Sequence, residues 1–515
     1  MTPDAELYYQ KKLQRLADRE LRMFKRTLPQ AASSVRKIHL TGVCGTAMGS
    51  LAGLLKEAGY EVTGSDEAAY PPMSDQIVAL GIPLFEGFKA ENLAGADLVV
   101  IGNFSGPNNP EAKYARENNL PTLSIAEAFD LFFISGAAKG GTRKSLVVAG
   151  THGKTTTTGL LAHLFEDAGK DPTYLVGGVL KNTDKTYAYG KGNTVIVEGD
   201  EYDTAYFDKS PKFLHYHPTS AVITSLEFDH IDIYDDLADY TQAFRFLAES
   251  IPEDGHLFLW GDDKNVRALA ASVKCNIHFY GFLDDNQLEA RNIETTSDGE
   301  SFSLFANKKE LGRVKTTLHG RHNILNTLAV CGMALSNGLS FEEIRQGLGS
   351  FAGMKRRQEI VGEVNGISVV DDFAHHPTAV RETIASIREK FPKRRLIAFF
   401  EPRSNTSRRK LFEEEYGKAF DQADLVYLSV PPLRHNDSKD DFIDEEKVAA
   451  AIIERASENG ALDNGGLPKA TFYPKAAELL KAALPHLQSG DVILIMSNGS
   501  FDGIHKDLLN ALKSR

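Results

Sequence analysis

A glycine-rich loop with a lysine and a run of threonines has the most specific chemical pattern in this 515-residue chain. In VVAGTHGKTTTTGLLAHLF, residues 147–165, an apolar strand precedes the loop and a helical pattern follows it. A phosphate-binding loop needs backbone N–H groups converging at a helix N-terminus. Gly150 and Gly153 supply flexible backbone for this. Lys154 supplies a cation for the terminal phosphates, and Thr155 a hydroxyl for Mg²⁺. We therefore predict that the loop binds ATP.

The loop departs from the usual form of this motif at its first position. The motif begins with a glycine, and this chain has Val148 there. A plain glycine turn between a strand and a helix is the alternative interpretation. That alternative explains little, because four consecutive threonines, 155–158, make a poor first helical turn by propensity.

Two asparagines add a second polar group with a useful spacing. Asn323 and Asn326 are three residues apart in a predicted helix, so their side chains share one face. Paired amides in this arrangement have the geometry to contact adenine.

A second glycine-rich turn, GVCGTAMGSLAGLL, lies near the start of the chain. Its glycines, Gly42, Gly45 and Gly49, do not have the G-x-G-x-x-G spacing of a dinucleotide site. Backbone amides at a strand-to-helix turn nevertheless suit a diphosphate. Asp66 ends the next predicted strand, where a nucleoside contact or a simple strand-terminating turn is expected.

A third polar group follows two predicted strands near the C-terminus. Parallel α/β folds place ligands at such strand ends, and cations with amide donors suit a ligand that carries carboxylates. A polar loop facing water is the alternative for any single member. The residues are Arg403, Asn405, Ser407, Arg408, Ser497 and Asn498.

These loops need a scaffold, and the chain reads as alternating strands and helices, which predicts parallel sheets. We expect a helical extension (1–36) and three α/β domains (37–140, 141–350 and 351–515), with a glycine- and lysine-rich linker at 135–145. The strand-like runs are KIHLTGV, EVTGSD, DLVVIGN, SLVVAG, NTVIVEGD, SAVITSL, GISVVDDF, RRLIAFFEP, ADLVYLSV and DVILIMSNG.

Composition agrees with an ordinary globular protein of several domains, with 42% hydrophobic and 25% charged residues. The net charge of −12 argues against a general nucleic-acid binder. Three scattered cysteines fit a reducing compartment, and no apolar run predicts a membrane span, so we expect a cytoplasmic protein. The extension has seven basic residues between Lys11 and Arg26, which predicts either a helix packed on the body or one lying on a membrane surface.

The form GTHGKTTT resembles the loop of the Mur ligases, the ATP-dependent amide-forming enzymes of peptidoglycan precursor synthesis. The resemblance continues in order through almost the whole chain after Lys37. The similar segments are VEGDEYDTAYFD, EFDHIDIY, HGRHNILNTLAV and MKRRQEIVGEVNGISVVDDFAHHPTAV. One departure is Ser225, where the family pattern has an asparagine.

The resemblance implies a Rossmann-like N-domain, a P-loop ATPase central domain and a Rossmann-like C-domain. It also implies transfer of the γ-phosphoryl group of ATP to a carboxylate, and then attack by an amine. The catalytic residues implied are Lys154, Glu198, His230 and Arg356, with Thr155, Glu198 and His230 around Mg²⁺. The ATP-binding residues implied are Gly150, Thr151, His152, Gly153, Lys154, Thr155, Thr156, Asn323, Asn326, Arg356, Asp372 and His375. Arg357 has no assigned role, and a solvated side chain is one interpretation for it.

In the family members that this N-domain resembles, the first turn takes the diphosphate of a UDP-muramoyl substrate. The corresponding residues are Gly42, Gly45, Thr46, Gly49 and Asp66. Two such members differ in the amine. One adds L-alanine to UDP-N-acetylmuramate, and the other adds the tripeptide L-alanyl-γ-D-glutamyl-meso-diaminopimelate in peptidoglycan recycling.

Three stretches resemble the tripeptide enzyme: 65–74, 399–410 and 495–509. We therefore expect the tripeptide ligase, with the third polar group binding peptide. The L-alanine ligase is the alternative within the family. A P-loop switch protein is the alternative outside it, although such a protein gives no reason for the third domain.

Overall fold

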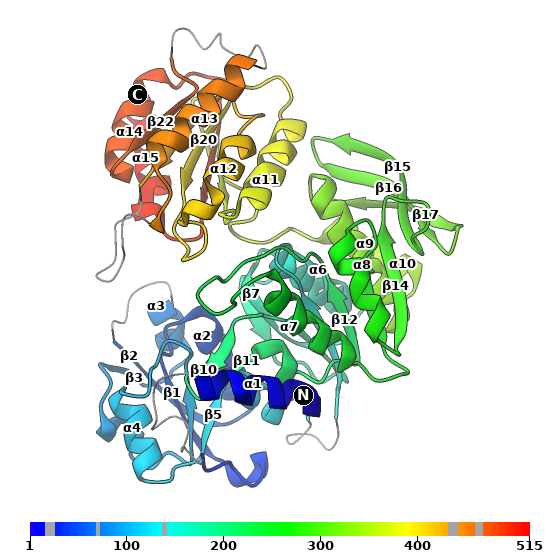
Figure 1. The fold of residues 1–515 in the computed structure, drawn as a ribbon, viewed down its shortest axis with the longest axis vertical. Coiled ribbons are helices and arrows are strands. Elements are labelled where there is room, and N and C mark those ends of the chain that lie inside the picture. The colour runs from blue at the N-terminus through cyan, green and yellow to red at the C-terminus, as the bar shows by residue number, and fades with distance from the viewer. Residues whose placement is uncertain (16–25, 68–72, 136–141, 431–440, 459–466) are drawn as a thin grey trace.

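Three sheet-centred lobes follow one another along the chain in the computed structural model (Figure 1). The structure describes residues 1–15, 26–67, 73–135, 142–430, 441–458 and 467–515. Most of the predicted linker and part of the stretch 65–74 lie outside these residues.

The N-domain has a five-stranded parallel sheet in the order β3-β2-β1-β4-β5. Its strands are β1 (Lys37–Thr41), β2 (Glu61–Asp66), β3 (Leu84–Glu86), β4 (Leu98–Ile101) and β5 (Thr122–Ser124). Its helices are α2 (Thr46–Glu57), α3 (Met73–Ala79), α4 (Pro110–Glu117) and α5 (Ile125–Phe129). Because the strand order reverses between β1 and β4, the crevice outside their carboxyl ends is the place for a ligand.

The central domain has a ten-stranded sheet in the order β17-β16-β15-β14-β13-β12-β6-β9-β7-β8. The strands are β6 (Lys144–Ala149), β7 (Thr173–Leu180), β8 (Lys185–Ala188), β9 (Thr194–Glu198), β12 (Ser220–Ile223), β13 (His256–Trp260), β14 (Asn276–Gly281), β15 (Leu288–Thr296), β16 (Gly299–Ala306) and β17 (Lys309–Thr316). A separate hairpin pairs β10 (Asp203–Ala205) with β11 (Asp208–Pro211). The helices are α6 (Lys154–Asp167), α7 (Leu237–Glu249), α8 (Lys264–Ala268), α9 (Arg321–Ser336) and α10 (Phe341–Ser350).

The C-domain has a six-stranded sheet in the order β18-β19-β23-β20-β21-β22. The strands are β18 (Glu359–Val364), β19 (Ile367–Asp372), β20 (Leu396–Glu401), β21 (Leu425–Ser429), β22 (Ala470–Tyr473) and β23 (Val492–Ser497). The helices are α11 (Pro377–Lys390), α12 (Glu413–Ala419), α13 (Glu445–Glu458), α14 (Ala476–Ala483) and α15 (Ile504–Lys513). The predicted fold class of three α/β domains is therefore confirmed, and every strand-like run of the sequence contains a strand.

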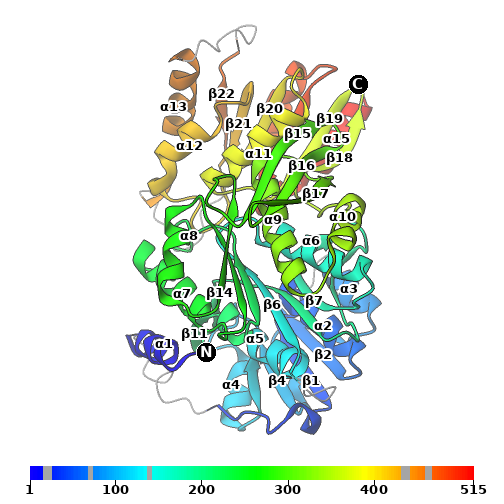
Figure 2. The same cartoon turned by 90° about the vertical axis from the view of Figure 1, so that its right-hand side faces the viewer.

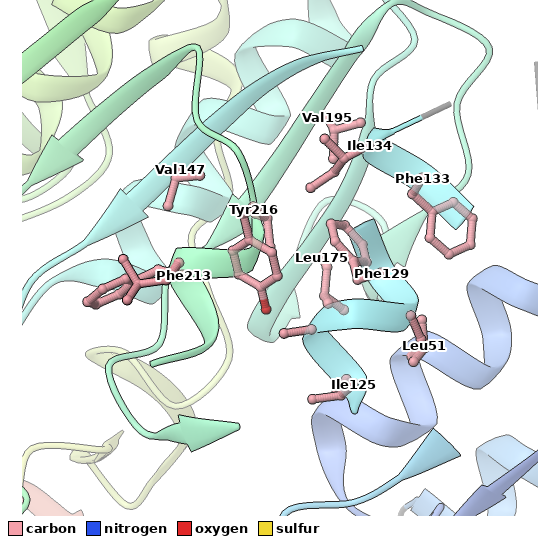
Figure 3. Close-up of a cluster of buried hydrophobic side chains, with 14 of the residues drawn as sticks. Leu51, Ile125, Phe129, Phe133, Ile134, Val147, Leu175, Val195, Phe213 and Tyr216 are labelled. Atoms are coloured by element: carbon pink, nitrogen blue, oxygen red, sulfur yellow. The ribbon is translucent and has the colours of Figure 1, made fainter. Parts of the chain in front are cut away.

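The N-domain and the central domain share one apolar core (Figure 3). Leu51 of α2 and Phe129 of α5 lie with Leu175 of β7 and Val195 of β9 in this cluster, and Leu51, Phe129 and Val195 are fully buried. The C-domain instead has two clusters of its own, one on each face of its sheet. The first two domains are thus joined by apolar packing, and the third has a separate core.

The N-terminal extension begins with α1 (Pro3–Arg15), which packs on the central domain beside α7 (Figure 2). The rings of Tyr8 and Tyr9 pack against Phe246, and Lys12 forms an ion pair with Asp239 at 2.8 Å. This agrees with the packed-helix interpretation for the residues described, whereas 16–25 lie outside them. Within the described chain, no helix has the length and apolar character needed to span a membrane.

Candidate active site

The phosphate-type loop, residues 150–153, joins β6 to α6. Two of its glycines have backbone conformations that other residues rarely adopt. Gly150 has φ +129°, and a Cβ there would lie 2.2 Å from Thr224 Oγ1 and 2.8 Å from the Thr224 amide nitrogen. Gly153 has φ +81°, and a Cβ there would lie 2.6 Å from Asn326 Oδ1. Both glycines therefore combine a backbone that disfavours side chains with a close approach to a neighbour.

Residues that follow β12 fasten the loop. Ser225 Oγ accepts the His152 amide at 2.8 Å, and Thr224 Oγ1 donates to the His152 carbonyl at 2.5 Å. Thr151 Oγ1 donates to the carbonyl of Glu227 at 2.9 Å. Ser225 thus supports the loop directly at the position where the family pattern has asparagine. Sequence reasoning gave Thr224 and Ser225 no supporting role, although both lie at the end of the predicted strand SAVITSL.

Lys154 is held by a buried carboxylate. Its Nζ lies 2.8 Å from Glu201 Oε2, and Glu201 is completely buried. Burial opposes the charged amine, but the carboxylates of Glu201 and Asp200 outweigh it and raise the pKa of Lys154 above its ordinary value. Tyr240 also donates to Glu201 at 3.3 Å. The amine is therefore charged at neutral pH, and Glu201, to which the sequence assigned no direct role, is its partner.

The residues predicted to hold Mg²⁺ lie around this ion pair. Thr155 Oγ1 donates to Glu198 Oε1 at 3.0 Å, and the Gly177 amide donates to Glu198 Oε2 at 2.7 Å. His230 Nε2 lies 3.0 Å from Glu201 Oε1. Hydroxyl and carboxylate oxygens are the ligands that Mg²⁺ prefers, so Thr155 and Glu198 fit the ion.

The imidazole of His230 is protonated in this arrangement. Burial opposes its charge, but Asp229 and Glu201 raise the pKa of His230 to about 9. It must therefore lose a proton before its nitrogen can bind a metal ion.

A cavity of about 710 Å³ lies between the central domain and the C-domain. Asn323, Asn326 and Thr156 line it from the central domain, and Asp372 from the C-domain. Asn326 donates to Asn323 Oδ1 at 3.1 Å, so the two amides share one face of α9, as their spacing predicts. The volume lies within the range of small-molecule sites.

Two neighbouring arginines point to different places. Arg356 donates through Nη2 to the carbonyls of Ser497 and Gly499, both at 2.7 Å. Arg357 donates to Thr155 Oγ1 at 3.2 Å and lines the cavity. The solvated interpretation of Arg357 is therefore wrong, because this side chain reaches across the domain boundary to the phosphate-type loop. The sequence did contain a signal for this role, because Arg357 is a second cation directly beside Arg356, the arginine that matches the family pattern.

Asp372 is the last residue of β19 in the C-domain, and His375 follows it. Asp372 is buried and accepts the amides of Gln358 and Ala374 at 2.8 Å and 2.7 Å. Burial raises the pKa of Asp372 and lowers the pKa of His375 to about 4. His375 is therefore neutral at pH 7.

Glu227 of the central domain also contacts the C-domain. Its Oε2 accepts Thr378 Oγ1 at 2.7 Å and lies 3.3 Å from His152 Nε2 and 3.6 Å from His376 Nδ1. The phosphate-type loop and the start of α11 therefore meet on one carboxylate. No motif in the sequence indicated this contact.

The third polar group gathers at the adjacent ends of β20 and β23. Glu401 and Ser497 are paired across the sheet, and Ser497 Oγ donates to Glu401 Oε2 at 2.7 Å. Arg403 packs on Gly499, where a Cβ would lie 2.3 Å from the arginine Cδ. Arg408 is buried, with its guanidinium 4.6 Å from the centre of the Phe442 ring.

The loop after β20 also touches the central domain. The His230 amide donates to Thr406 Oγ1 at 3.1 Å, and Asn405 donates to Asp232 at 3.3 Å. Ser407 Oγ accepts the Ser404 amide at 2.9 Å and so shapes the loop itself. The structure thus brings this loop against the segment that carries the predicted metal-binding histidine.

The N-domain turn is formed as a separate site. Gly42 has φ +78°, and its amide donates to the Ser65 carbonyl at 2.8 Å. Asp66 Oδ2 accepts the Cys44 amide at 2.8 Å, so one carboxylate oxygen holds the turn. A Cβ at Gly49 would lie 3.1 Å from the Val43 carbonyl. Gly45 is the N-cap of α2 and Thr46 is its first residue, which points the helix N-terminus at the crevice.

Comparisons with known proteins match each domain in turn. The Mur ligase family, catalytic domain, matches residues 37–133, the Mur ligase middle domain matches 148–334, and the Mur ligase, glutamate ligase domain, matches 356–499. The chain is 36% identical to the UDP-N-acetylmuramate–L-alanyl-γ-D-glutamyl-meso-2,6-diaminoheptandioate ligase of Escherichia coli K12 over 484 residues, which are 93% of this chain and 99% of the relative.

Two further comparisons bear on the identity of the amine. The chain is 37% identical to the UDP-N-acetylmuramate–L-alanine ligase of Rubrobacter xylanophilus, but over 394 residues, which are 76% of this chain and 83% of that relative. The crystal structure of a murein peptide ligase from Psychrobacter arcticus 273-4 superposes with a TM-score of 0.68 at 32% identity and covers 93% of this chain and 99% of that one.

Proposed function

The chain belongs to the Mur ligase family, and we propose that it joins L-alanyl-γ-D-glutamyl-meso-diaminopimelate to UDP-N-acetylmuramate at the expense of ATP. The 36% identity to a tripeptide ligase over 93% of this chain supports this substrate pair. An L-alanine ligase reaches 35% identity over 91% of the chain, so the choice of amine rests on the C-domain loop. The nucleotide switch is disfavoured, because it gives no use for the two flanking domains.

The observation that carries the proposal is the loop 403–408. It contains Arg403, whose Nη1 makes no hydrogen bond among the described residues and lies 3.6 Å from Glu401 Oε1. It also touches the segment of His230. A tripeptide with several carboxylates needs cations, and its amine must reach the activated carboxylate. A cationic loop between the C-domain strand ends and the segment of His230 meets both requirements.

The reaction that we propose has two steps. The muramoyl carboxylate attacks the γ-phosphorus of ATP, giving an acyl phosphate and ADP. The peptide amine then attacks the acyl carbon, the C–O bond to phosphate breaks, and the amine loses a proton. Amide, ADP and inorganic phosphate are the products.

The protein's part in this chemistry is mainly to neutralise charge. Lys154 and Arg357 bring cations to the phosphates when the amine of Lys154 exchanges Glu201 for the nucleotide. Thr155, Glu198 and His230 would hold Mg²⁺, which screens the charge of the phosphate oxygens. Asn323 and Asn326 would contact adenine, and Asp372 and His375 would lie beside the ribose and the phosphates. Arg356 would orient the strand-end loop 497–499 toward peptide.

The test is phosphate release from ATP with Mg²⁺ and UDP-N-acetylmuramate, with either the tripeptide or L-alanine as amine. Phosphate release and a ligated product with the tripeptide alone are expected. The same result with L-alanine alone would assign the chain to the alanine-adding reaction. Lys154→Met is the control for contaminating ATPase, and it should release no phosphate above background.

A further inference from the structure

Two histidines and a carboxylate meet where the phosphate-type loop faces the C-domain. Glu227 Oε2 lies 3.3 Å from Nε2 of His152, which belongs to the loop. The same oxygen lies 3.6 Å from Nδ1 of His376, the N-cap residue of α11. One nitrogen of each imidazole and one oxygen of the carboxylate all lie within 4.8 Å of one another. This group shares no residue with the predicted Mg²⁺ ligands.

The separations within the group are those of a tetrahedral metal site. Zn²⁺ binds imidazole nitrogen and carboxylate oxygen at about 2.0–2.2 Å, so two ligand atoms of a tetrahedral site lie about 3.3–3.6 Å apart. The two distances to Glu227 Oε2, 3.3 Å and 3.6 Å, fall within this range. Two histidines with one carboxylate are also the protein ligands of zinc sites that keep a fourth position open. These three side chains can therefore bind Zn²⁺ after only small movements.

His376 is the member of the group that its other contacts explain least. It is only 6% exposed, and its Nε2 is buried without a hydrogen bond to any described residue. Its Nδ1 accepts the Thr378 amide at 3.4 Å, which is longer than an ordinary hydrogen bond. Because Nδ1 accepts an amide proton, it has a lone pair and no proton of its own. A metal ion needs such a nitrogen, and here it lies beside a carboxylate.

Access from solvent distinguishes this group from a second cluster of two acidic residues and a histidine, which includes Glu127 and His215. Arg26 already occupies both carboxylate oxygens of Glu127, at 2.8 Å and 2.9 Å. In contrast, His152 and Glu227 line the cavity of about 710 Å³ between the central domain and the C-domain. An ion can therefore reach the first group through this cavity.

We propose that His152, Glu227 and His376 form a Zn²⁺ site that holds the C-domain against the phosphate-type loop. The central domain supplies the first two ligands and the C-domain supplies the third, so the bound ion bridges the two domains. Water completes the tetrahedron at the open position. Because His152 and Glu227 also line the cavity proposed for ATP, bound Zn²⁺ inhibits ligation. This inhibition rests on the proposed function, whereas binding of the ion does not.

Calorimetric titration of the full chain with ZnCl₂, in excess Mg²⁺, tests the site. A single Zn²⁺ should bind to each chain. Glu227→Gln and His376→Asn should each weaken it more than about 10-fold, because losing even a group that only orients a metal ligand costs that much. Glutamine can still accept the Thr378 hydroxyl, and asparagine is a good N-cap, so both variants should fold. His215→Asn is the matched control from the second cluster and should leave Zn²⁺ affinity unchanged.

CoCl₂ gives a second measurement that does not depend on catalysis. Tetrahedral Co²⁺ absorbs visible light far more strongly than the hydrated octahedral ion. This absorption should appear with the native chain and should be lost with His376→Asn. In the phosphate-release assay at constant Mg²⁺, Zn²⁺ should slow the native chain. It should slow Glu227→Gln and His376→Asn less, with each variant compared with its own rate in the absence of Zn²⁺.

Three outcomes would overturn the proposal in different ways. Equal Zn²⁺ affinity in the native chain and both ligand variants would place the ion elsewhere. A loss of affinity in only one variant would contradict a site that needs all three side chains. Zn²⁺ binding that depends on both residues but leaves ligation unchanged would overturn the inhibition alone. A native chain that ligates neither amine would contradict the proposed function, and the calorimetric result would still decide whether the site exists.

Discussion

Replacing Lys154 with methionine should destabilise the central domain as well as abolish ligation. The substitution removes the cation of a buried pair in which Glu201 is fully buried and Lys154 is 14% exposed. Breaking such a pair costs about 3–5 kcal/mol, because the remaining charge is left without its partner. Nearby Asp200 keeps Lys212 at 2.7 Å, so Glu201 is the carboxylate that loses compensation.

The magnitude should fall at the lower end of that range. Glu201 keeps His230 at 3.0 Å, and the pKa of His230, about 9, leaves that imidazole charged at pH 7. Tyr240 also continues to donate to Glu201. We therefore expect Lys154→Met to lower the free energy of unfolding by about 3 kcal/mol at neutral pH. The kcat for ligation should fall at least about 100-fold.

Urea unfolding followed by tryptophan fluorescence can measure this cost. The chain has one tryptophan, Trp260, which ends β13 and lines the interdomain cavity, so its signal reports the central domain. Lys212→Met is the matched control. Lys212 is 10% and its partner Asp200 42% exposed, so this pair is more open to water than the pair of Lys154 and should contribute less than about 3 kcal/mol.

A shift in the Lys154→Met midpoint no larger than that of Lys212→Met would refute the reasoning. It would mean that the amine of Lys154 is solvated in the nucleotide-free protein. Loss of ligation without loss of stability would then place Lys154 in phosphate binding alone.

Three further substitutions test other parts of the site. Gly150→Ala should lower ATP affinity by more than about 10-fold, since its Cβ would meet the Thr224 backbone. Gly349→Ala is the control and should leave ATP binding unchanged, because a Cβ there meets no atom within 4 Å. Equal ATP affinity in both variants would contradict the loop geometry. Arg403→Ala should raise the KM for peptide about 10-fold or more with little effect on the KM for ATP, and an unchanged peptide KM would remove Arg403 from the site. Burial, with a smaller contribution from Lys390, lowers the pKa of His319 to about 4. The contribution of the neutral imidazole to the free energy of unfolding is therefore complete above about pH 6.5 and is lost as pH falls toward 4. His319→Asn should therefore reduce the loss of stability between pH 7 and pH 5 by about 1–2 kcal/mol in urea titrations, and identical pH profiles would contradict this origin.

Much of the fold follows from patterns that are local in the sequence. The strand EVTGSD corresponds to Glu61–Asp66, and the helix after the phosphate-type loop begins at Lys154, as the glycines indicate. The antiparallel strands β15, β16 and β17 were not predicted. Their residues have mixed polarity with many charges, so they lack the apolar runs that marked the buried parallel strands.

The candidate site was predictable where residue type and spacing define a role. Helical periodicity alone was enough to predict that Asn323 and Asn326 share one face of a helix. The contacts of Glu201, Arg357 and Glu227 join residues far apart in the chain, and no local pattern encodes such pairings. Family resemblance singled out Arg356, whereas the side chain that reaches Thr155 belongs to its neighbour Arg357, and Arg356 instead contacts Ser497 and Gly499.

The two domain junctions should respond oppositely to the solvent. The apolar core between the N-domain and the central domain is strengthened by excluded salts such as sulfate and is weakened by cooling. The contacts from the central domain to the C-domain include Thr378 with Glu227 and the ion pair of Lys181 with Glu359 at 3.6 Å, which dissolved ions screen. Salt concentration would thus act as a selective control: concentrated sulfate would tighten the first junction while loosening the C-domain from the phosphate-type loop.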